Sequence, residues 1–490
     1  MPFLTYKRAI QLRQNLQDTQ ATVITPDQEG YPELINRWSE ASEKEAGAVV
    51  IVTSSHEISL VITFATYHYI PFVVQGGGFS TSGASSTHGG IVINLSMMRR
   101  VVVDPASQTV AVQGGATWDE VDQASAKEGL AVVGCTTSAA GVGGTTLGGG
   151  FGWLTGRHGL VIDNLISVKI VLADGRIMTA SADENQDLFW AIRGAGQSFG
   201  VVTEFVLRAH PQRPSVFGGF IYLPIEQLSA VVEFANQFDT QTTGDEALFF
   251  GFTTRPHAPL PIVIVALLFY NGPSTAAEAF FGPLLALESI QNETHEMPYL
   301  KMNTILGRFV APGTRKSVSG TTFALPLDLQ LMQEVHDDFD KFIRTYPRVE
   351  GSAVIFELIP YTRVNQIPVE ATAYANRGRY HNVVSIFRWY DQELDMKMMN
   401  LERAMIRKIR DRAGVVSIAG QGVGVYANYA GTNSSDSVSQ ALINTILGHE
   451  TNAEELFGKN LPRLQELKTV YDPKNMFRKW HNLLIPSTAH

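Results

Sequence analysis

The chain has 490 residues, more than the roughly 250–300 at which one hydrophobic core stops growing, so at least two domains are expected. Hydrophobic residues make up 44% and charged residues 17%, which suits a folded protein and excludes wholesale disorder. The net charge is −9 and no basic block occurs, so neither nucleic acid nor a membrane surface is an expected partner.

One cysteine, Cys135, excludes an intramolecular disulfide and a cysteine-based zinc cluster. The first twenty residues lack the apolar core of a signal peptide, and no run approaches the ~18 apolar residues of a membrane span. A cytoplasmic protein is therefore expected. The histidines show no HExxH motif and no cluster at ligand spacing, so no metal site is predicted.

The first 209 residues read as mixed α/β structure around two glycine-dense loops. Residues 76–90 hold six glycines and residues 134–152 hold eight. Thr117 followed by Glu120 predicts a capping box at the start of a helix that stops near Gly129. A second short helix is predicted over 184–192. Strands are predicted over 90–95, 101–104, 109–113, 165–172 and 201–207.

After residues 210–214 the pattern changes to long apolar, β-rich runs with amphipathic helices between them. This pattern predicts an α+β layer, a sheet covered on one face by helices. In the last stretch, Asn460 is predicted to cap a helix with Pro462 in its first turn. Strands are predicted over 217–223, 247–253, 262–270 and 382–389, and helices around 331–342 and 398–409.

Backbone N–H groups bind phosphate well where glycine leaves them accessible. Two such loops in one domain could wrap the pyrophosphate of a dinucleotide, although a single glycine cluster is more often a tight turn. Neither loop is a Walker A or a GxGxxG motif. Residues 196–200 spell GxSxG, but helix precedes strand there, which is the wrong order for a nucleophile elbow.

Several motifs resemble the FAD-linked oxidases of the berberine bridge enzyme-like group, within the vanillyl-alcohol oxidase superfamily. They span most of the chain in the family's order. They are PFVVQGGGFS (71–80), GVGGTTLGGGFGW (141–153), GLVIDNL (159–165), ADGR (173–176), ENQDLFWAIR (184–193), FGVVT (199–203), YANY (426–429) and YDPKNMF (471–477).

The resemblance implies a PCMH-type two-part FAD-binding domain (1–209), a substrate domain with an antiparallel sheet covered by helices (210–440), and a C-terminal segment (441–490) that returns to the FAD domain. It also implies that a small organic substrate gives a hydride to the flavin, and that dioxygen reoxidises it. The residues expected to bind FAD are Gln75, Gly76, Gly77, Gly78, Phe79, Ser80, Thr137, Gly141, Gly143, Gly144, Thr146, Gly150, Gly152, Trp153 and Val201.

The sequence departs from the family where many members bond FAD covalently. Phe79 stands where the anchoring histidine would be, and Thr137 stands where some members carry a cysteine. Cys135 lies two residues away, out of register unless the loop shifts. Phenylalanine cannot form the linkage, so FAD is expected to bind without a covalent bond.

Among candidate catalytic groups, the resemblance singles out Tyr426, which lies over the flavin in oxidising relatives and acts there as a base. A tyrosine, with a pKa near 10, needs a neighbouring cation or hydrogen bond for this role. Asn428, two residues on, could orient the ligand, and His158 could act as an acid near the cofactor. The alternatives are buried sheet tyrosines and a turn histidine.

The base that some plant relatives carry on the strand before Trp389 falls at Val384 and is absent. Other polar residues of the substrate half could line a pocket, but their spacing selects none of them: Glu357, Tyr361, Tyr374, Arg377, His381 and Arg388.

Two further functions stay open from the sequence. Loss of the covalent anchor would make the flavin a weaker hydride acceptor, so the scaffold could serve a non-redox isomerase or cyclase, with FAD structural or absent. A binding or scaffolding protein is the third alternative. Substrate and oligomeric state are not readable from the sequence.

Overall fold

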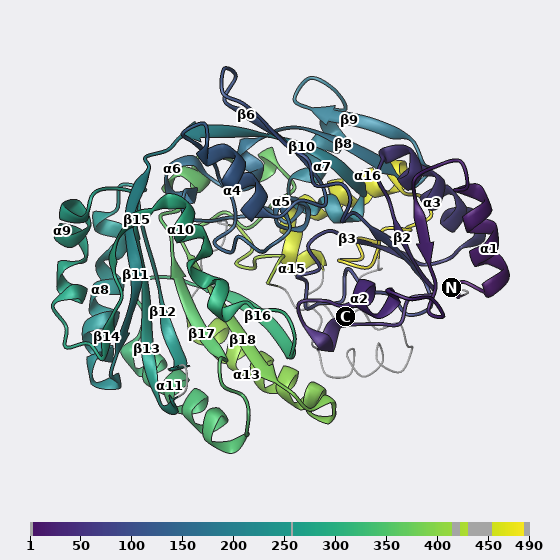
Figure 1. The fold of residues 1–490 in the computed structure, drawn as a ribbon. Helices are drawn as coiled ribbons and strands as arrows, with labels where there is room; N and C mark the ends of the chain where they lie inside the picture. The colour runs from purple at the N-terminus through teal and green to yellow at the C-terminus, as the bar shows by residue number, and fades with distance from the viewer. Residues whose placement is uncertain (1–2, 256–257, 414–421, 430–452, 485–490) are drawn as a thin grey trace.

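A computed structural model describes residues 3–255, 258–413, 422–429 and 453–484. Within these ranges the chain forms three β-sheets (Figure 1). The two sheets built from residues 22–211 lie to the right and top of Figure 1, and the third, built from residues 215–389, lies to the left. Helices cover the outer face of this third sheet. The structure therefore confirms the predicted α+β class.

The first sheet has four strands in the order β1-β2-β4-β3, and β4 runs parallel to both β2 and β3. Helix α3 (Ser55–His68) packs on it. The first glycine loop follows β3 directly, so the sheet sets where that loop begins. The strands are β1 (Thr22–Ile24), β2 (Ala48–Ile51), β3 (Phe72–Gln75) and β4 (Ile91–Asn94).

The second sheet is antiparallel, in the order β5-β6-β10-β8-β9, with β7 paired to β10. The second glycine loop, residues 134–152, follows β7 and contains the short helix α5 (Val142–Leu147). The strands are β5 (Val101–Asp104), β6 (Thr109–Gln113), β7 (Leu130–Val132), β8 (Leu165–Leu172), β9 (Ile177–Ser181) and β10 (Gly200–Pro211).

The third and largest sheet is entirely antiparallel, in the order β14-β11-β13-β12-β17-β18-β16, with β15 paired to β11. Its strands are β11 (Ser215–Leu223), β12 (Glu246–Arg255), β13 (Ala258–Tyr270), β14 (Gln291–Asn292), β15 (His295–Pro298), β16 (Arg315–Phe323), β17 (Ala353–Leu358) and β18 (His381–Trp389).

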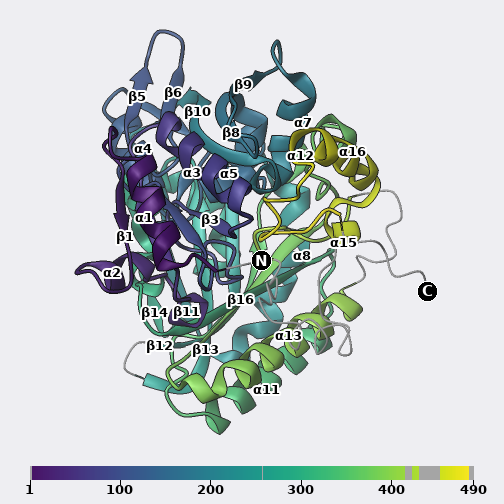
Figure 2. The same cartoon turned by 90° about the vertical axis from the view of Figure 1, so that its right-hand side faces the viewer.

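Alternate side chains of this large sheet enter two different cores, because successive residues of a strand point to opposite faces. On β12, Leu248 and Phe250 pack with the helices, whereas Phe249 packs with the FAD-binding part of the chain. In Figure 2 the long helices α11 and α13 lie along the outer side of the sheet. The covering helices are α8 (Leu228–Gln241), α9 (Ser274–Leu285), α11 (Leu329–Thr345) and α13 (Asp395–Arg412).

The predicted capping box is confirmed at the start of α4 (Trp118–Ala126), where the Thr117 N–H donates to Glu120 Oε2 at 2.9 Å. The predicted helix–strand order around GxSxG is also confirmed, since α7 (Gln186–Ala195) precedes β10. The other α-helices within the described residues are α1 (Tyr6–Asn15), α2 (Tyr31–Ile35), α6 (Thr155–His158), α10 (Tyr299–Thr304), α12 (Thr362–Asn365), α15 (Ala453–Phe457) and α16 (Leu461–Tyr471).

The C-terminal helix α16 begins where predicted, with Asn460 at its N-cap position, but the predicted capping hydrogen bond is not formed. The Asn460 side chain does not cap the helix; its Nδ2 donates to the carbonyls of Val369 and Thr372, at 2.9 and 3.1 Å. Farther along α16, the buried Lys468 Nζ donates to Ser198 O at 2.6 Å and pairs with Asp472 at 2.7 Å. The bond to Ser198 attaches α16 to the loop between α7 and β10.

The division of the chain at residues 209 and 440 stays a prediction, and residue 440 lies outside the described residues. None of the helices in the described ranges is both long enough and apolar enough to cross a membrane.

Candidate active site

A cavity of about 410 Å³ lies between the two glycine loops and the inner face of the large sheet. This volume falls within the range of small-molecule and cofactor sites, about 300–1,000 Å³. Its wall also includes Tyr426, Asn428 and Tyr429, and residues 476, 477, 479 and 480 of the C-terminal segment. Parts of the chain that are far apart in sequence therefore meet at one cavity.

The two glycine loops touch each other at the cavity, and only glycine permits this approach. A Cβ on Gly77 would lie 2.6 Å from the backbone nitrogen of Gly141, and a Cβ on Gly141 would lie 2.6 Å from that of Gly77. At Gly144, which lines the cavity, an added Cβ would meet nothing within 4 Å. Accessible backbone on two touching loops fits the pyrophosphate of FAD.

Ten of the fifteen residues predicted to bind FAD line the cavity, namely Gly76, Gly77, Gly78, Phe79, Ser80, Thr137, Gly141, Gly143, Gly144 and Val201. The other five do not, namely Gln75, Thr146, Gly150, Gly152 and Trp153. Trp153 lies one layer behind the wall, because its ring stacks on Phe249, a lining residue, with 5.0 Å between centroids. The side chain of Gln75 instead accepts a hydrogen bond from Asn94 at 3.2 Å.

At the position of the missing histidine, Phe79 stacks on Trp38 with 4.6 Å between ring centroids and 12° between planes. Both rings line the cavity. Cys135 is half-buried and lines the cavity as well. Burial raises the pKa of its thiol to about 11, so the thiol stays protonated at neutral pH and is a weak nucleophile.

Tyr426 and Asn428 lie together in the wall. Asn428 Nδ2 donates to the Tyr426 hydroxyl at 2.9 Å and lies 3.3 Å from the carbonyl of Thr145 in the second glycine loop. The Tyr426 ring meets Phe151 and Tyr429 edge-on, with centroids 5.1 and 4.8 Å away. Burial among uncharged rings holds the pKa of Tyr426 well above its usual value, so its phenol stays protonated.

Glu357, on β17, is the group that sequence reasoning could not single out. Its carboxyl is buried and lines the cavity, and Oε1 accepts a hydrogen bond from the Tyr429 hydroxyl at 3.1 Å. Oε2 is buried without a hydrogen-bond partner. Burial raises the pKa of this carboxyl to about 8. The sequence contains one feature that marks Glu357, since it is the single acidic residue in the apolar strand run AVIFEL. Burying an unpaired carboxylate is costly, so an acidic residue at such a position indicates a special role.

The structure does not bring His158 to the cavity. Its ring stacks on His210 with 3.7 Å between centroids, and His210 Nε2 lies 2.8 Å from Asn164 Oδ1. Burial and the neighbouring His210 lower the pKa of His158 to about 4. Of the other polar residues of the substrate half that the sequence left unselected, only Glu357 lines the cavity.

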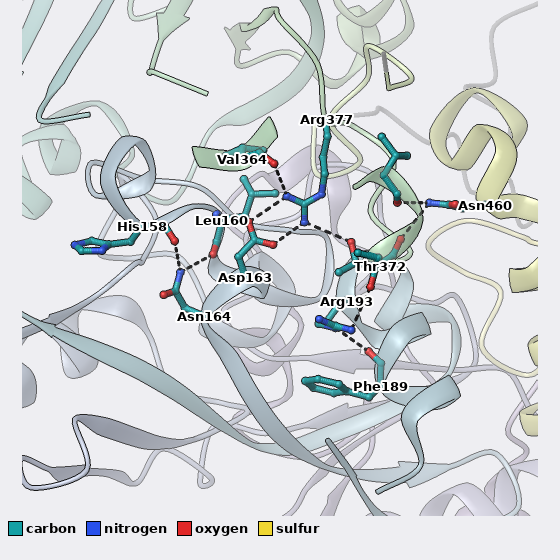
Figure 3. A network of polar contacts seen from close by, with 12 residues as sticks. His158, Leu160, Asp163, Asn164, Phe189, Arg193, Val364, Thr372, Arg377 and Asn460 are labelled. Carbon is teal, nitrogen blue, oxygen red and sulfur yellow. Dashed lines mark hydrogen bonds and ion pairs between the residues drawn. The ribbon is translucent and has the colours of Figure 1, made fainter. Parts of the chain in front are cut away.

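Arg377, one of those candidates, instead forms a buried ion pair with Asp163 (Figure 3). Its Nη2 lies 2.6 Å from Asp163 Oδ1 and its Nη1 lies 3.1 Å from Oδ2. The backbone N–H of Leu160 donates to Oδ2 at 2.9 Å. Both charged side chains are almost fully buried, at 1% and 3% exposure. The pair joins the GLVIDN motif to the segment after α12.

The same segment contacts two further elements of Figure 3. Arg193 Nη2 at the end of α7 donates to the carbonyl of Ala371 at 3.3 Å, and Asn460 holds the neighbouring carbonyls. The ring of Tyr374, in this segment, lies edge-on to Tyr426 with 6.4 Å between centroids. We call residues 369–377 the clasp segment, because it contacts the FAD-binding part, the C-terminal helix and the site tyrosine.

No group of three or more His, Cys, Asp or Glu side chains within the described ranges is arranged to hold a metal ion. Beside the backbone amides of the glycine loops, the polar side chains that line the cavity are hydroxyls, the Cys135 thiol, the amides of Gln197 and Asn428, the Lys479 amine and the Glu357 carboxyl. This set suits an organic cofactor and an organic substrate.

Comparison with known proteins agrees with this chemistry. Residues 46–181 match the family described as FAD binding domain, and residues 425–483 match Berberine and berberine like. The FAD-linked oxidoreductase pgmH of Aspergillus terreus is 34% identical over 490 residues, covering 96% of this chain and 94% of the relative. The FAD-linked oxidoreductase hasG of Aspergillus fumigatus is 31% identical, covering 79% and 84%.

Solved structures share the fold at lower sequence identity. The 6-hydroxy-D-nicotine oxidase of Arthrobacter nicotinovorans superposes with a TM-score of 0.79 at 23% identity, covering 96% of this chain and 98% of that one. A variant of berberine bridge enzyme in complex with (S)-reticuline gives a TM-score of 0.79 at 20% identity, with both chains fully covered. These likenesses establish the fold.

Proposed function

The chain belongs to the berberine bridge enzyme-like family of FAD-linked oxidoreductases, and from this premise we propose that it oxidises a small organic molecule of secondary metabolism with FAD bound non-covalently. The observation that carries the proposal is the single cavity where the two touching glycine loops face Tyr426, Asn428 and Glu357. Dioxygen is the proposed final electron acceptor.

Non-covalent binding follows from the residues at the anchor positions. Phe79 offers no nucleophile, and its ring is engaged by Trp38. The nearest histidine in the loop, His88, packs edge-on against Phe3 and does not line the cavity. The Cys135 thiol, with its pKa raised to about 11, is mostly un-ionised at neutral pH. FAD would then be held by the loops and the shape of the cavity.

When bound, FAD supplies the hydride acceptor for the oxidation. The loops around Gly77 and Gly141 hold the pyrophosphate through backbone amides. Asn428 fixes the hydroxyl of Tyr426, which stays protonated and donates a hydrogen bond to the substrate. The sequence analysis suggested Tyr426 as a base, a role that needs a neighbouring cation or hydrogen bond. Among the described groups around the Tyr426 hydroxyl there is a hydrogen bond from Asn428 but no cation.

Glu357 is the proposed proton acceptor. A general base works best when its pKa lies near the working pH, and the pKa of Glu357 is raised to about 8. Glu357 and Tyr426 line the same cavity, and Oε2 of Glu357 has no hydrogen-bond partner. As the substrate is oxidised, its hydroxyl proton passes to Oε2, while Tyr429 keeps its hydrogen bond to Oε1.

The visible absorption spectrum of purified protein, before and after acid precipitation, tests the proposal. We expect a yellow protein whose colour moves into the supernatant, and hydrogen peroxide release with a substrate. Colour retained in the pellet would contradict non-covalent binding. A colourless protein that takes up no added FAD, or a product of unchanged mass without peroxide, would instead favour a non-redox isomerase or cyclase.

A further inference from the structure

The sheet side of the cavity is almost entirely apolar. Residues two apart on one strand share a face, and β13 contributes Val265 and Leu267 while β18 contributes Val384 and Ile386. Aromatic rings extend this wall, with Phe220 from β11, Phe249 from β12 and Phe309 from the short 3-10 helix that follows α10.

Two polar side chains interrupt this wall. Among the described residues that the strands of the large sheet contribute to the cavity, only Thr253 and Glu357 are polar, and Glu357 is the sole ionisable one. Thr253 already donates its hydroxyl hydrogen to the carbonyl of Ser352 at 3.0 Å. Glu357 therefore provides the main hydrogen-bonding atom that this wall offers to a ligand.

That atom is Oε2, which is buried without a partner on a residue only 4% exposed. A buried polar atom left unsatisfied costs about 1–3 kcal/mol, so a ligand group that reaches it gains that much. A matched carboxyl on the other face of the sheet, Glu402 of α13, shows the contrast. Serine hydroxyls donate to both its oxygens, among them Ser385 to Oε1 at 2.9 Å and Ser319 to Oε2 at 3.2 Å.

The wall disfavours the other ligand classes. A polyol would leave most of its hydroxyls unpaired against aliphatic and aromatic side chains. An anion would meet the carboxyl of Glu357 on this wall, whereas Lys479, the one Lys, Arg or His among the described lining residues, comes from the C-terminal segment and not from the sheet. A cation would have to lose its hydration against an apolar wall. Glu357, whose pKa is raised to about 8, would also have to ionise to pair with it.

We infer that the substrate is an uncharged, largely aromatic molecule with one hydroxyl group that hydrogen-bonds to Oε2 of Glu357. The inference rests on the proposed function, since it names the substrate class of the same cavity. Ring faces and edges of the ligand pack on Phe220, Phe249 and Phe309, and the hydroxyl fixes its orientation.

The test is calorimetric binding of matched probes to the FAD-loaded protein without oxygen, at pH 9. There Glu357 is ionised and only accepts hydrogen bonds. The groups around it are Tyr429, Tyr426, Tyr361 and Cys135, whose pKa values are all raised above their usual range. The probes are 2-naphthalenemethanol, its methyl ether, 2-naphthoate, benzyltrimethylammonium and cellobiose.

We expect the alcohol to bind roughly tenfold more tightly than its methyl ether. This affinity gap corresponds to one hydrogen bond worth about 1.4 kcal/mol. At pH 6.5 the gap should shrink, because a protonated Glu357 can donate to the ether oxygen. Glu357→Leu should abolish the gap at pH 9. Glu402→Gln, the matched buried carboxyl, should leave it unchanged.

Tighter binding of cellobiose, naphthoate or the ammonium ion than of the alcohol would overturn the inference. So would a gap that survives Glu357→Leu in protein that still binds FAD, or no binding by aromatic alcohols of one to three rings. The proposed function fails separately, by absence of bound flavin, and the same titrations on flavin-free protein still report the substrate class.

Discussion

Two buried carboxyls, one paired with Arg377 of the clasp segment and one in the cavity wall, differ in their partners rather than in their burial. Asp163 and Glu357 are both almost fully buried. Asp163 receives two hydrogen bonds from Arg377 and one from a backbone N–H. Glu357 receives one, and its second oxygen has none. Burial is therefore common to the two carboxyls, whereas the unsatisfied oxygen distinguishes Glu357, the one that lines the cavity.

The largest effect is expected from Glu357→Gln. This variant keeps the shape of the side chain, but its amide cannot accept the proton. We expect kcat/KM to fall by about 10²–10⁴-fold. In the parent protein the carboxylate is the active form, so kcat/KM should rise with pH and level off above about 8. The variant should lose this inflection, as measured by steady-state oxygen consumption between pH 6 and 9.5. A retained inflection would assign the proton transfer to another group.

The second variant, Asp163→Asn, acts on the clasp. It leaves the buried Arg377 guanidinium without a counter-charge, and such a loss costs about 3–5 kcal/mol in the free energy of unfolding. Urea unfolding followed by tryptophan fluorescence measures it. Asp340→Asn removes an exposed i,i+4 pair with Arg344 and should cost only about 0.3–0.5 kcal/mol. Equal losses in the two variants would contradict a structural role for the clasp pair.

The third variant, Gly77→Ala, tests the contact between the glycine loops. The new Cβ would press on the backbone of Gly141, and overpacking of this kind costs about 1–3 kcal/mol. FAD affinity should fall about tenfold or more, measured by fluorescence titration of flavin-free protein. Gly282→Ala, at a helical position with nothing within 4 Å, should leave FAD affinity unchanged. An unchanged affinity for FAD in Gly77→Ala would show that the glycine loops do not form the cofactor site.

The smallest effect is expected from Tyr426→Phe. It removes one neutral hydrogen-bonding group, worth about 1 kcal/mol, so kcat should fall roughly fivefold to tenfold while KM changes little. Tyr361→Phe removes a buried phenol that does not line the cavity and should leave kcat within about twofold. A loss near 10³-fold in Tyr426→Phe, with a shifted pH profile, would make Tyr426 the base instead of Glu357.

Local patterns in the chain were sufficient for the elements and for the cofactor. The Thr117–Glu120 capping box, the apolar runs of the large sheet and the glycine loops rest on interactions between near neighbours or on backbone geometry that only glycine allows. The motifs around Gly77 and Gly141 likewise indicated FAD, and the family match confirms it.

Only the tertiary structure decided which polar residues face the cavity. Glu357, Tyr361, Arg377 and His381 were equivalent in the sequence, because the local pattern around each residue does not say what lies opposite its side chain. Pairing of β17 between β12 and β18 sends Glu357 toward the loops, while Arg377 meets Asp163 across 214 positions of chain. Contacts between residues so far apart in the sequence depend on how whole elements pack, and no local pattern predicts them.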